Sequence, residues 1–255
     1  MTNTGRLVWY ELLTTDPKAA IAFYTEVIRW KTEPFGADYT MFVGSQGPLG
    51  GVSVLPETAK KMGAPPYWQV NIEVANVDQT VEQVKKLGGQ IHVVETVPTV
   101  GRFAVIADPQ GAVVAVYTPE KSGASHDITN DGEVSWNELY TTDHQAAFGF
   151  YTAIAGWERL GTFDMGPMGT YLIWGREGKQ LGGMMTKPKE MPHPAWMFYF
   201  TASDLEGTMN RATGKGAKVI NGPMEVPGGQ RIVQLIDPQG AAFALVTPPR
   251  GDGAR

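Results

Sequence analysis

The chain of 255 residues carries 42% hydrophobic and 18% charged residues, a net charge of −5 and no cysteine. Such a length and composition predict a globular protein of two ordinary domains. The acidic balance argues against nucleic acid or a membrane as partner, because both attract clustered Lys and Arg. No apolar stretch approaches the roughly 20 residues that span a bilayer, and the polar first residues predict no signal peptide. The lack of cysteine excludes disulfides and Cys-ligated metals, which favours a cytoplasmic protein.

The strongest signal is an internal repeat. Trp-x-Glu-Leu at Trp9–Leu12 returns at Trp136–Leu139, and both copies continue at the same spacing with Asp, Phe-Tyr and Trp. Each copy closes with Asp-Pro-Gln-Gly-Ala, at Asp108–Ala112 and Asp237–Ala241. A repeat of this length predicts two similar halves. We therefore expect a first domain over residues 1–119, a polar linker over residues 120–133 and a second domain over residues 134–250.

The first copy begins with a predicted strand and helix. Alternation over Leu7–Leu13 predicts a strand with Trp9 and Glu11 on one face. The pair Asp16-Pro17 predicts a helix start, because Asp caps helices well and Pro is tolerated in the first turn. Shorter strands are expected at residues 39–43 and 50–55. The Gly-Gly pair that opens the second of these predicts a β-bulge or a close backbone approach rather than a phosphate loop, because no helix follows it.

A second unit of the same kind follows. Alternation over Trp68–Val74 predicts a strand with Gln69 and Asn71 on its polar face, and a helix is expected over Asp78–Leu87. Further strands are expected at residues 91–94, 103–107 and 112–117, and the second copy repeats the whole order. Each half therefore predicts two units, each made of a strand, a helix and further strands.

These motifs resemble the vicinal oxygen chelate superfamily, which includes glyoxalase I, the bleomycin-resistance proteins and the extradiol dioxygenases. The Trp-x-Glu-Leu start, the Phe-Tyr helix and the Asp-Pro-Gln-Gly-Ala ending are most similar to two-repeat glyoxylase-type members, including a mycobacterial one. The resemblance runs from about Leu7 to Pro248. It implies an α+β fold in which four βαβββ units form two glyoxalase-like domains, with curved mixed sheets and helices on the convex face.

The resemblance also implies where a divalent metal would bind. Its ligands are a His on the first strand, a residue on the strand that opens the second unit, and a Glu on the final strand. Imidazole and carboxylate groups suit such a metal, whereas indole, thioether and methyl groups do not. In this chain the three positions hold Trp9, Gln69 and Ala115 in the first half, and Trp136, Met197 and Ala244 in the second. We therefore expect no metal and no other cofactor.

Glu11 and Glu138 are the candidate catalytic residues. Each lies two residues after its Trp and so faces the same side of its strand, which in this fold lines the cavity. A carboxylate among apolar side chains has a raised pKa and can act as a base. The alternative is that each Glu anchors a loop or a backbone amide of its own half.

The candidate substrate-binding residues come from the same strands and from two strand ends. Trp9 and Trp136 offer walls for a flat or apolar ligand, or are core residues. Gln69 and Asn71 form a polar face in the first half, where the second half has Met197 and Tyr199. Arg102 and Arg231 occupy equivalent positions and could bind a carboxylate or phosphate, or lie exposed.

Three hypotheses for function remain open from the sequence. The protein recognises a small organic molecule in an aromatic-lined cavity, either as a metal-independent lyase or isomerase with a Glu base, or as a non-catalytic sequestration protein of the bleomycin-resistance type. A third is a scaffold whose cavities are closed by Trp9 and Trp136. We expect a monomer or homodimer. If units pair within a half, Glu11 faces Gln69, and if they pair across halves it faces Met197 and Tyr199.

Overall fold

The computed structural model describes residues 4–121, 123 and 125–249. The predicted domain ends at residues 1 and 250, and residues 122 and 124 of the predicted linker, lie outside the described residues. The first half contains β1 (Leu7–Thr14), α1 (Pro17–Val27), β2 (Lys31–Phe35), β3 (Tyr39–Gly44), β4 (Gly47–Val54), α2 (Glu57–Lys61), β5 (Tyr67–Glu73), α3 (Val77–Lys86), β6 (Gln90–Val97), β7 (Gly101–Ala107) and β8 (Val113–Pro119). The second half contains β9 (Val134–Thr141), α4 (His144–Ala155), β10 (Glu158–Asp164), the 3₁₀ turn η1 (Gly166–Met168), β11 (Thr170–Arg176), β12 (Lys179–Thr186), β13 (Ala195–Thr201), α5 (Leu205–Gly214), β14 (Lys218–Glu225), β15 (Arg231–Ile236) and β16 (Ala242–Val246).

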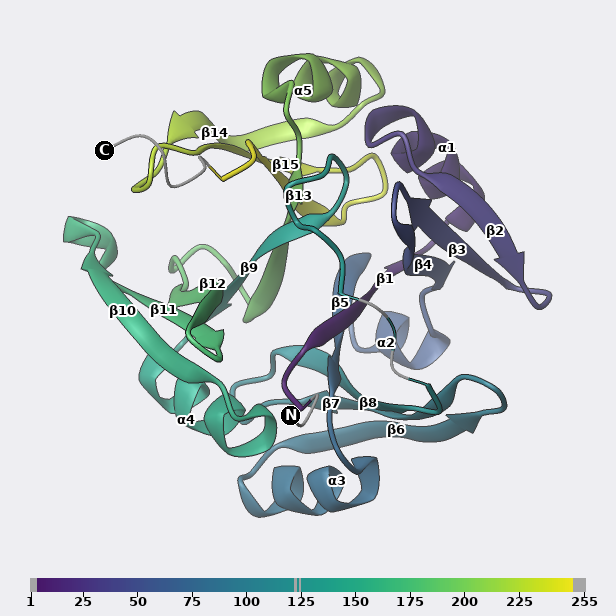
Figure 1. Ribbon diagram of the computed structural model, residues 1–255, viewed down its shortest axis with the longest axis vertical. Helices are drawn as coiled ribbons and strands as arrows, with labels where there is room; N and C mark the ends of the chain where they lie inside the picture. Colours follow the sequence, from purple (N-terminus) through teal and green to yellow (C-terminus); the bar gives the residue numbers. More distant parts are fainter. Residues whose placement is uncertain (1–3, 122, 124, 250–255) are drawn as a thin grey trace. The chain divides into compact units, whose positions relative to one another are not determined.

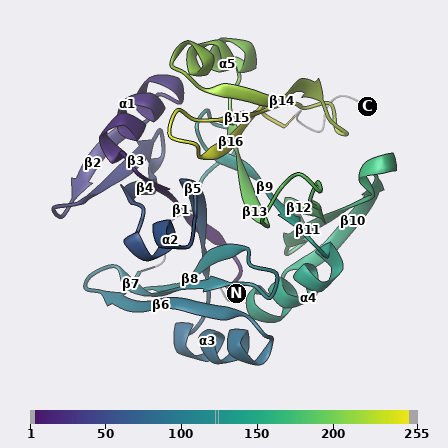
Figure 2. The same ribbon diagram turned by 180° about the vertical axis from the view of Figure 1, so that it is seen from behind.

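The strands form two eight-stranded mixed sheets, whose strands are labelled in Figure 1, apart from β16, which Figure 2 labels. The first has the order β2-β3-β4-β1-β5-β8-β7-β6, and the second has β10-β11-β12-β9-β13-β16-β15-β14. In each module the first strand pairs in parallel with the last, as β1 with β4 and β9 with β12. The predicted α+β fold of four βαβββ modules is therefore confirmed. Since β1 neighbours β5 and β9 neighbours β13, the two modules of each half share one sheet.

Local signals account for most elements. Asp16 caps α1 by accepting a hydrogen bond from the Ala19 N–H at 3.0 Å, as the Asp-Pro pair predicts. Its counterpart Asp143 caps α4 in the same way. The predictions missed the outer strand β2, because all five of its side chains are exposed and give no alternating hydrophobic pattern.

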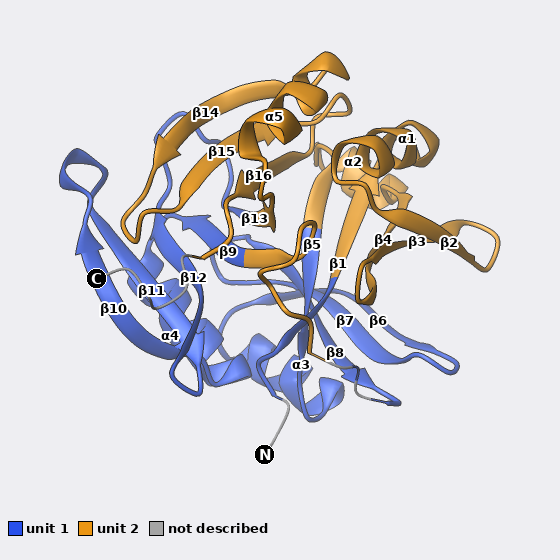
Figure 3. Ribbon diagram, turned by 45° about the horizontal axis from the view of Figure 1, so that its top comes forward, with its two compact units in different colours: residues 1–9, 69–124, 136–196 blue, residues 10–68, 125–135, 197–255 orange. Residues whose placement is uncertain are grey.

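The chain divides into two compact units (Figure 3). Unit 1 comprises residues 1–9, 69–124 and 136–196, and unit 2 comprises residues 10–68, 125–135 and 197–255. Each unit therefore contains one βαβββ module from each half of the chain. Within unit 2 helix α1 packs against α5, and within unit 1 α3 packs against α4, as the two opposite views show (Figure 1 and Figure 2).

A buried network of side chains joins the two modules of unit 2. Tyr24 Oη donates a hydrogen bond to Asp237 Oδ2 and accepts one from Trp68 Nε1, both at 3.0 Å. Asp237 Oδ1 accepts from the backbone N–H groups of its own turn, from Gln239 to Ala241. Burial, and then the charge of Asp237, raise the pKa of Tyr24 well above its ordinary range. The Phe-Tyr motif of one copy and the Asp-Pro turn of the other therefore form one joint.

Unit 1 repeats this joint with the roles of the copies exchanged. Tyr151 Oη donates to Asp108 Oδ2 at 3.3 Å, and the Tyr151 ring packs edge-on against Trp196. Trp157 stacks on Tyr151 and donates from Nε1 to the Gly5 carbonyl at 2.9 Å. These contacts explain why the same motifs occur in both copies: each tyrosine donates to the Asp-Pro turn of the other half.

Candidate functional site

Glu11 lies on β1 on the face that it shares with Trp9, and both side chains are half-buried. Ser53 Oγ on β4 donates to Glu11 Oε1 at 2.9 Å. Glu11 Oε2 has no hydrogen-bond partner in the part of the chain that the structure describes. Burial raises the pKa of the carboxyl above its ordinary value, and the Ser53 hydrogen bond only partly opposes this rise. A half-buried carboxylate with a raised pKa and one open oxygen has the properties of a general base.

Two tyrosines lie beside this carboxylate. Burial, and then the negative charge of Glu11, raise the pKa of Tyr67 at the start of β5 to about 12. The ring of Tyr39 on β3 lies over Gly51, where a Cβ atom would come within 2.2 Å of the Tyr39 hydroxyl. Gly51 lies directly opposite Glu11 in the pairing of β1 with β4. The predicted close backbone approach is found at Gly50, where a Cβ atom would come within 2.1 Å of the Tyr10 carbonyl oxygen, whereas at Gly51 the approaching group is the phenol of Tyr39.

Glu138, the counterpart on β9, lies in different surroundings. Its side chain is only 6% exposed, and the Tyr171 hydroxyl on β11 donates a hydrogen bond to it. Trp136 Nε1 donates in turn to Tyr171 Oη at 2.8 Å. Burial, and then the charge of Glu138, raise the pKa of Tyr171 well above its ordinary range. A hydrogen-bonded tyrosine therefore covers Glu138, which suits the predicted anchoring alternative better than catalysis.

The polar face of β5 carries two open acceptors. Gln69 Oε1 and Asn71 Oδ1 are buried and have no hydrogen-bond partner among the described residues. A buried acceptor without a donor costs about 1–3 kcal/mol, so such groups are normally bonded by water or a ligand. On β13, by contrast, Met197 is buried and Tyr199 Oη accepts from Gln234 Nε2 at 2.6 Å. The two halves therefore differ in polarity at these positions, and the first half has the unsatisfied groups.

The two predicted arginines are engaged by carboxylates of their own modules. Arg102 on β7 forms an ion pair with Asp78 of α3 at 2.7 Å. Arg231 on β15 forms the equivalent pair with Glu206 of α5. Exposed pairs of this kind contribute little to stability, at most about 1 kcal/mol. A role of either arginine in substrate binding stays a prediction.

The donor set at the family's metal positions does not fit a divalent metal. On the final strands Ala115 and Ala244 are fully buried and offer no donor atom, and they lie opposite Asn71 and Tyr199 in the strand pairing. Across the described ranges, no group of three or more His, Asp or Glu side chains is placed to hold a metal ion. The chemistry of these side chains therefore gives the metal no site at the family's positions.

Sequence reasoning missed the residues that contact the two glutamates. Tyr39 and Tyr171 are equivalent, because each covers the second glycine of its Gly-Gly pair. The loop before Tyr171 is longer than that before Tyr39, which hides the equivalence in the sequence. Ser53 gives no repeat signal, because the second half has Met185 at its place: Leu13 pairs with Ser53 and Tyr140 with Met185.

The fold and this site define a class: a two-sheet α+β protein of four βαβββ modules with a carboxylate on the first strand of each half. Two family models match the halves. A "Glyoxalase-like domain" matches residues 9–117, and the model "Glyoxalase/Bleomycin resistance protein/Dioxygenase superfamily" matches residues 133–245. The chain belongs to this glyoxalase, bleomycin resistance protein and dioxygenase superfamily, as the resemblance of its motifs predicts.

Relatives of known sequence cover nearly the whole chain. The chain is 30% identical to "Putative glyoxylase CFP32" of Mycobacterium tuberculosis, over 94% of both chains. It is 30% identical to "Anthracycline biosynthesis protein DauV" of Streptomyces sp. strain C5, over 98% of both.

Solved structures share the fold at low identity. The Mn(II)-bound glyoxalase of Novosphingobium aromaticivorans has a TM-score of 0.66 and 17% identity, over 97% of this chain and 83% of that one. The 2,2',3-trihydroxybiphenyl 1,2-dioxygenase of Sphingomonas wittichii has a TM-score of 0.69 and 11% identity, over 98% of this chain and 93% of that one. At such identities the likeness concerns the fold alone.

No helix in the described ranges is long and apolar enough to cross a membrane.

Proposed function

We propose that this protein is a glyoxalase-like lyase or isomerase that moves a proton on a small carbonyl compound, with Glu11 as the base and without a metal. The observation that carries the proposal is the state of the Glu11 carboxylate. Ser53 fixes Oε1, Oε2 has no partner among the described residues, and burial raises the pKa. Glu138 has the same place in its half but is covered by Tyr171, so the proposal assigns the reaction to the first half.

The proposed step is proton abstraction next to a carbonyl group. Glu11 Oε2 takes the proton of the C–H bond, and the electrons of that bond form the C=C bond of an enol or enolate. For a substrate with a hydroxyl group beside the carbonyl, Glu11 then returns the proton to the former carbonyl carbon. The hydroxyl proton passes through solvent to the former carbonyl oxygen, which completes an isomerisation without oxidant or reductant. A raised pKa lies closer to neutral pH, and a carboxyl group with such a pKa can both take up and return a proton efficiently.

The first half also offers groups that suit a hydroxylated substrate. The buried acceptors Gln69 Oε1 and Asn71 Oδ1 would accept hydrogen bonds from substrate hydroxyl groups. Trp9, half-buried on β1, supports the idea of an aromatic wall for a flat ligand. Two relatives are named for anthracycline biosynthesis, which adds flat aromatic carbonyl compounds to the ligands worth testing.

The rival is sequestration of a small molecule without turnover, as in the bleomycin-resistance members. It is favoured by the residues at the family's metal positions, where Ala115 and Ala244 provide no ligand. The two proposals share the binding site and differ in whether a substrate proton moves.

Hydrogen exchange into a panel of small carbonyl compounds distinguishes the two proposals. The protein is incubated in D₂O and EDTA with hydroxyacetone, glyceraldehyde, or the adduct of methylglyoxal and glutathione, and loss of the C–H signal is followed by proton NMR. We expect catalysed exchange that Glu11→Gln abolishes and that the matched Glu138→Gln variant retains.

Three outcomes would contradict the enzymatic proposal. Exchange that persists in Glu11→Gln would show that another group is the base. Exchange that EDTA removes and added Mn²⁺ or Zn²⁺ restores would contradict a metal-free reaction. Binding of a compound, seen as shifted ligand signals, without any exchange across the panel would favour sequestration.

A further inference from the structure

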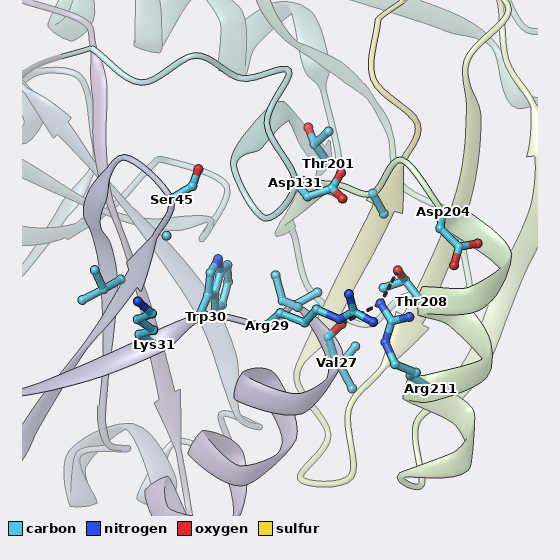
Figure 4. A pocket seen from close by; sticks show the side chains of 14 residues that line it. Val27, Arg29, Trp30, Lys31, Ser45, Asp131, Thr201, Asp204, Thr208 and Arg211 are labelled. Atoms are coloured by element: carbon cyan, nitrogen blue, oxygen red, sulfur yellow. Dashed lines mark hydrogen bonds between the residues drawn. The ribbon is translucent and has the colours of Figure 1, made fainter.

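A pocket with a volume of about 440 Å³ lies within unit 2, where the end of α1 faces α5 (Figure 4). Its lining includes Val27 to Lys31 from the end of α1 and the start of β2, and Thr208 and Arg211 from α5. None of the site residues predicted from the sequence lines it. The pocket is therefore distinct from the surroundings of Glu11.

Three cations line this pocket. The side chains of Arg29 and Lys31 are exposed and form no ion pair or hydrogen bond with any described residue. Arg211 donates to Thr208 Oγ1 at 2.7 Å and to the Val27 carbonyl at 3.3 Å. Its Nε atom is buried and has no hydrogen-bond partner among the described residues. Figure 4 shows the side chains of Arg29 and Arg211 extending to the same region of the pocket, beside Thr208.

The two carboxylates of the lining already accept hydrogen bonds from nearby protein groups. Asp131 Oδ1 accepts hydrogen bonds from the Ser203 N–H and Oγ, both at 2.7 Å. Asp204 caps α5 and accepts from the Gly207 N–H at 2.9 Å. Neither forms an ion pair with the pocket cations in the described part of the chain. The pocket thus has more positive than negative side chains, with donors that no protein group uses.

The other half supplies a built-in comparison. A pocket of unit 1 is lined by Ala155, Gly156 and Glu158 at the end of α4, and its one cation, Arg176, forms an ion pair with Glu177. By position in the repeat, Gly156 corresponds to Arg29 and Glu158 to Lys31. Gln83 corresponds to Arg211, and its amide donates to the Ala153 carbonyl at 3.0 Å. The three cations therefore occur only in the unit 2 copy, so the repeated fold does not require them.

The backbone of Arg29 has a left-handed conformation that is uncommon for a residue with a side chain. Arg29 follows α1 with φ of 68°, and its counterpart Gly156 follows α4 with φ of 70°. This left-handed conformation suits glycine and costs other residues about 1 kcal/mol or more. Since Arg29 gains no hydrogen bond within the described protein in return, its placement is typical of residues that act on a ligand.

We propose that this pocket binds the oxyanion group of a small molecule, a phosphate or a carboxylate, between the guanidinium groups of Arg29 and Arg211. Guanidinium groups bind such oxygens through paired N–H donors, and the unpartnered Nε of Arg211 supplies one of them. Lys31 adds charge without fixed geometry. The site is independent of the reaction proposed for Glu11. The competing explanation is that these cations only complement the negative C-terminal end of α1.

Titration with inorganic phosphate and with succinate, at constant ionic strength balanced with NaCl, tests the proposal. Binding is measured by calorimetry and by the ¹H–¹⁵N signals of the arginine Nε groups, of which the Arg211 signal is identified by its loss in Arg211→Gln. We expect saturable binding that shifts the Arg211 signal. Arg29→Gly and Arg211→Gln should each weaken it about tenfold or more, the loss of roughly one strong charged contact.

Arg29→Gly keeps the experiment interpretable, because it restores the residue of the counterpart. It should be as stable as the parent or more so, and lost binding then cannot be ascribed to unfolding. Lys179→Gln, which removes an exposed cation of unit 1, should bind as the parent does. Binding of phosphate alone or of succinate alone identifies the group. No saturable binding of either anion, or full binding by the Arg29→Gly/Arg211→Gln double variant, would overturn the proposal.

Discussion

Removal of one hydroxyl, in Tyr24→Phe, tests the joint that holds unit 2. The substitution deletes the hydrogen bonds of Tyr24 Oη to Asp237 and from Trp68, both 3.0 Å long and buried. A net hydrogen bond contributes about 1 kcal/mol, and one to a charged group about 1.5–3 kcal/mol. Asp237 keeps its three backbone N–H partners, which limits the loss. We therefore expect the free energy of unfolding to fall by about 3 kcal/mol.

Urea unfolding followed by both tryptophan fluorescence and circular dichroism measures this loss. With a slope of about 3 kcal/mol per molar urea for a chain of this size, the midpoint should fall by about 1 M. The control is Tyr117→Phe, which removes one hydrogen bond to the Val100 carbonyl from a half-exposed side chain that water can replace. A loss in Tyr24→Phe no larger than that in Tyr117→Phe would refute the reasoning.

Two further predictions concern the candidate site. Gly183→Ala should lower the free energy of unfolding by about 1–3 kcal/mol, because the new Cβ would lie 2.0 Å from the Tyr171 ring; Gly149→Ala in α4, where a Cβ meets no atom within 4 Å, should stabilise by up to about 1 kcal/mol. Glu11→Gln should be more stable than the parent at pH 7, and this difference should vanish at pH values below the ordinary pKa of 4.5. The sign follows from the raised pKa. The folded state binds the Glu11 proton more tightly than the unfolded state does, so the parent loses stability as pH rises from 4.5 through the raised pKa of the folded state. Urea unfolding at both pH values measures it, and a destabilised Glu11→Gln at pH 7 would show that the carboxylate is structural.

Much of the fold could be predicted because local and long-range signals agree. The caps at Asp16 and Asp143 and the alternation along β1 are read from a few neighbouring residues. The repeat then places these elements twice. The outer strand β2 escaped prediction for a physical reason: its exposed side chains carry no burial pattern, and its pairing with β3 determines its conformation.

The candidate site was predictable only in part, because a site depends on contacts between strands. The repeat identified Glu11 and Glu138 and their common face, but the difference between them comes from their neighbours. Ser53 and Tyr171 reach the two carboxylates from strands distant in sequence, and the strand register decides which side chain lies there. The pocket cation Arg29 was missed because it follows a helix, where an Arg is unremarkable until the left-handed backbone is known.

Identity between the two copies is therefore better evidence for folding than for function in this chain. A buried hydrogen bond must keep both partners, so Tyr24 with Asp237 and Tyr151 with Asp108 can be altered only at a cost to their unit. Such joints make copies alike whatever they bind. A ligand site is under no such requirement to match its counterpart, and the open groups, such as Arg29, occur where the copies differ. The search for substrates should accordingly begin at the differences between the halves.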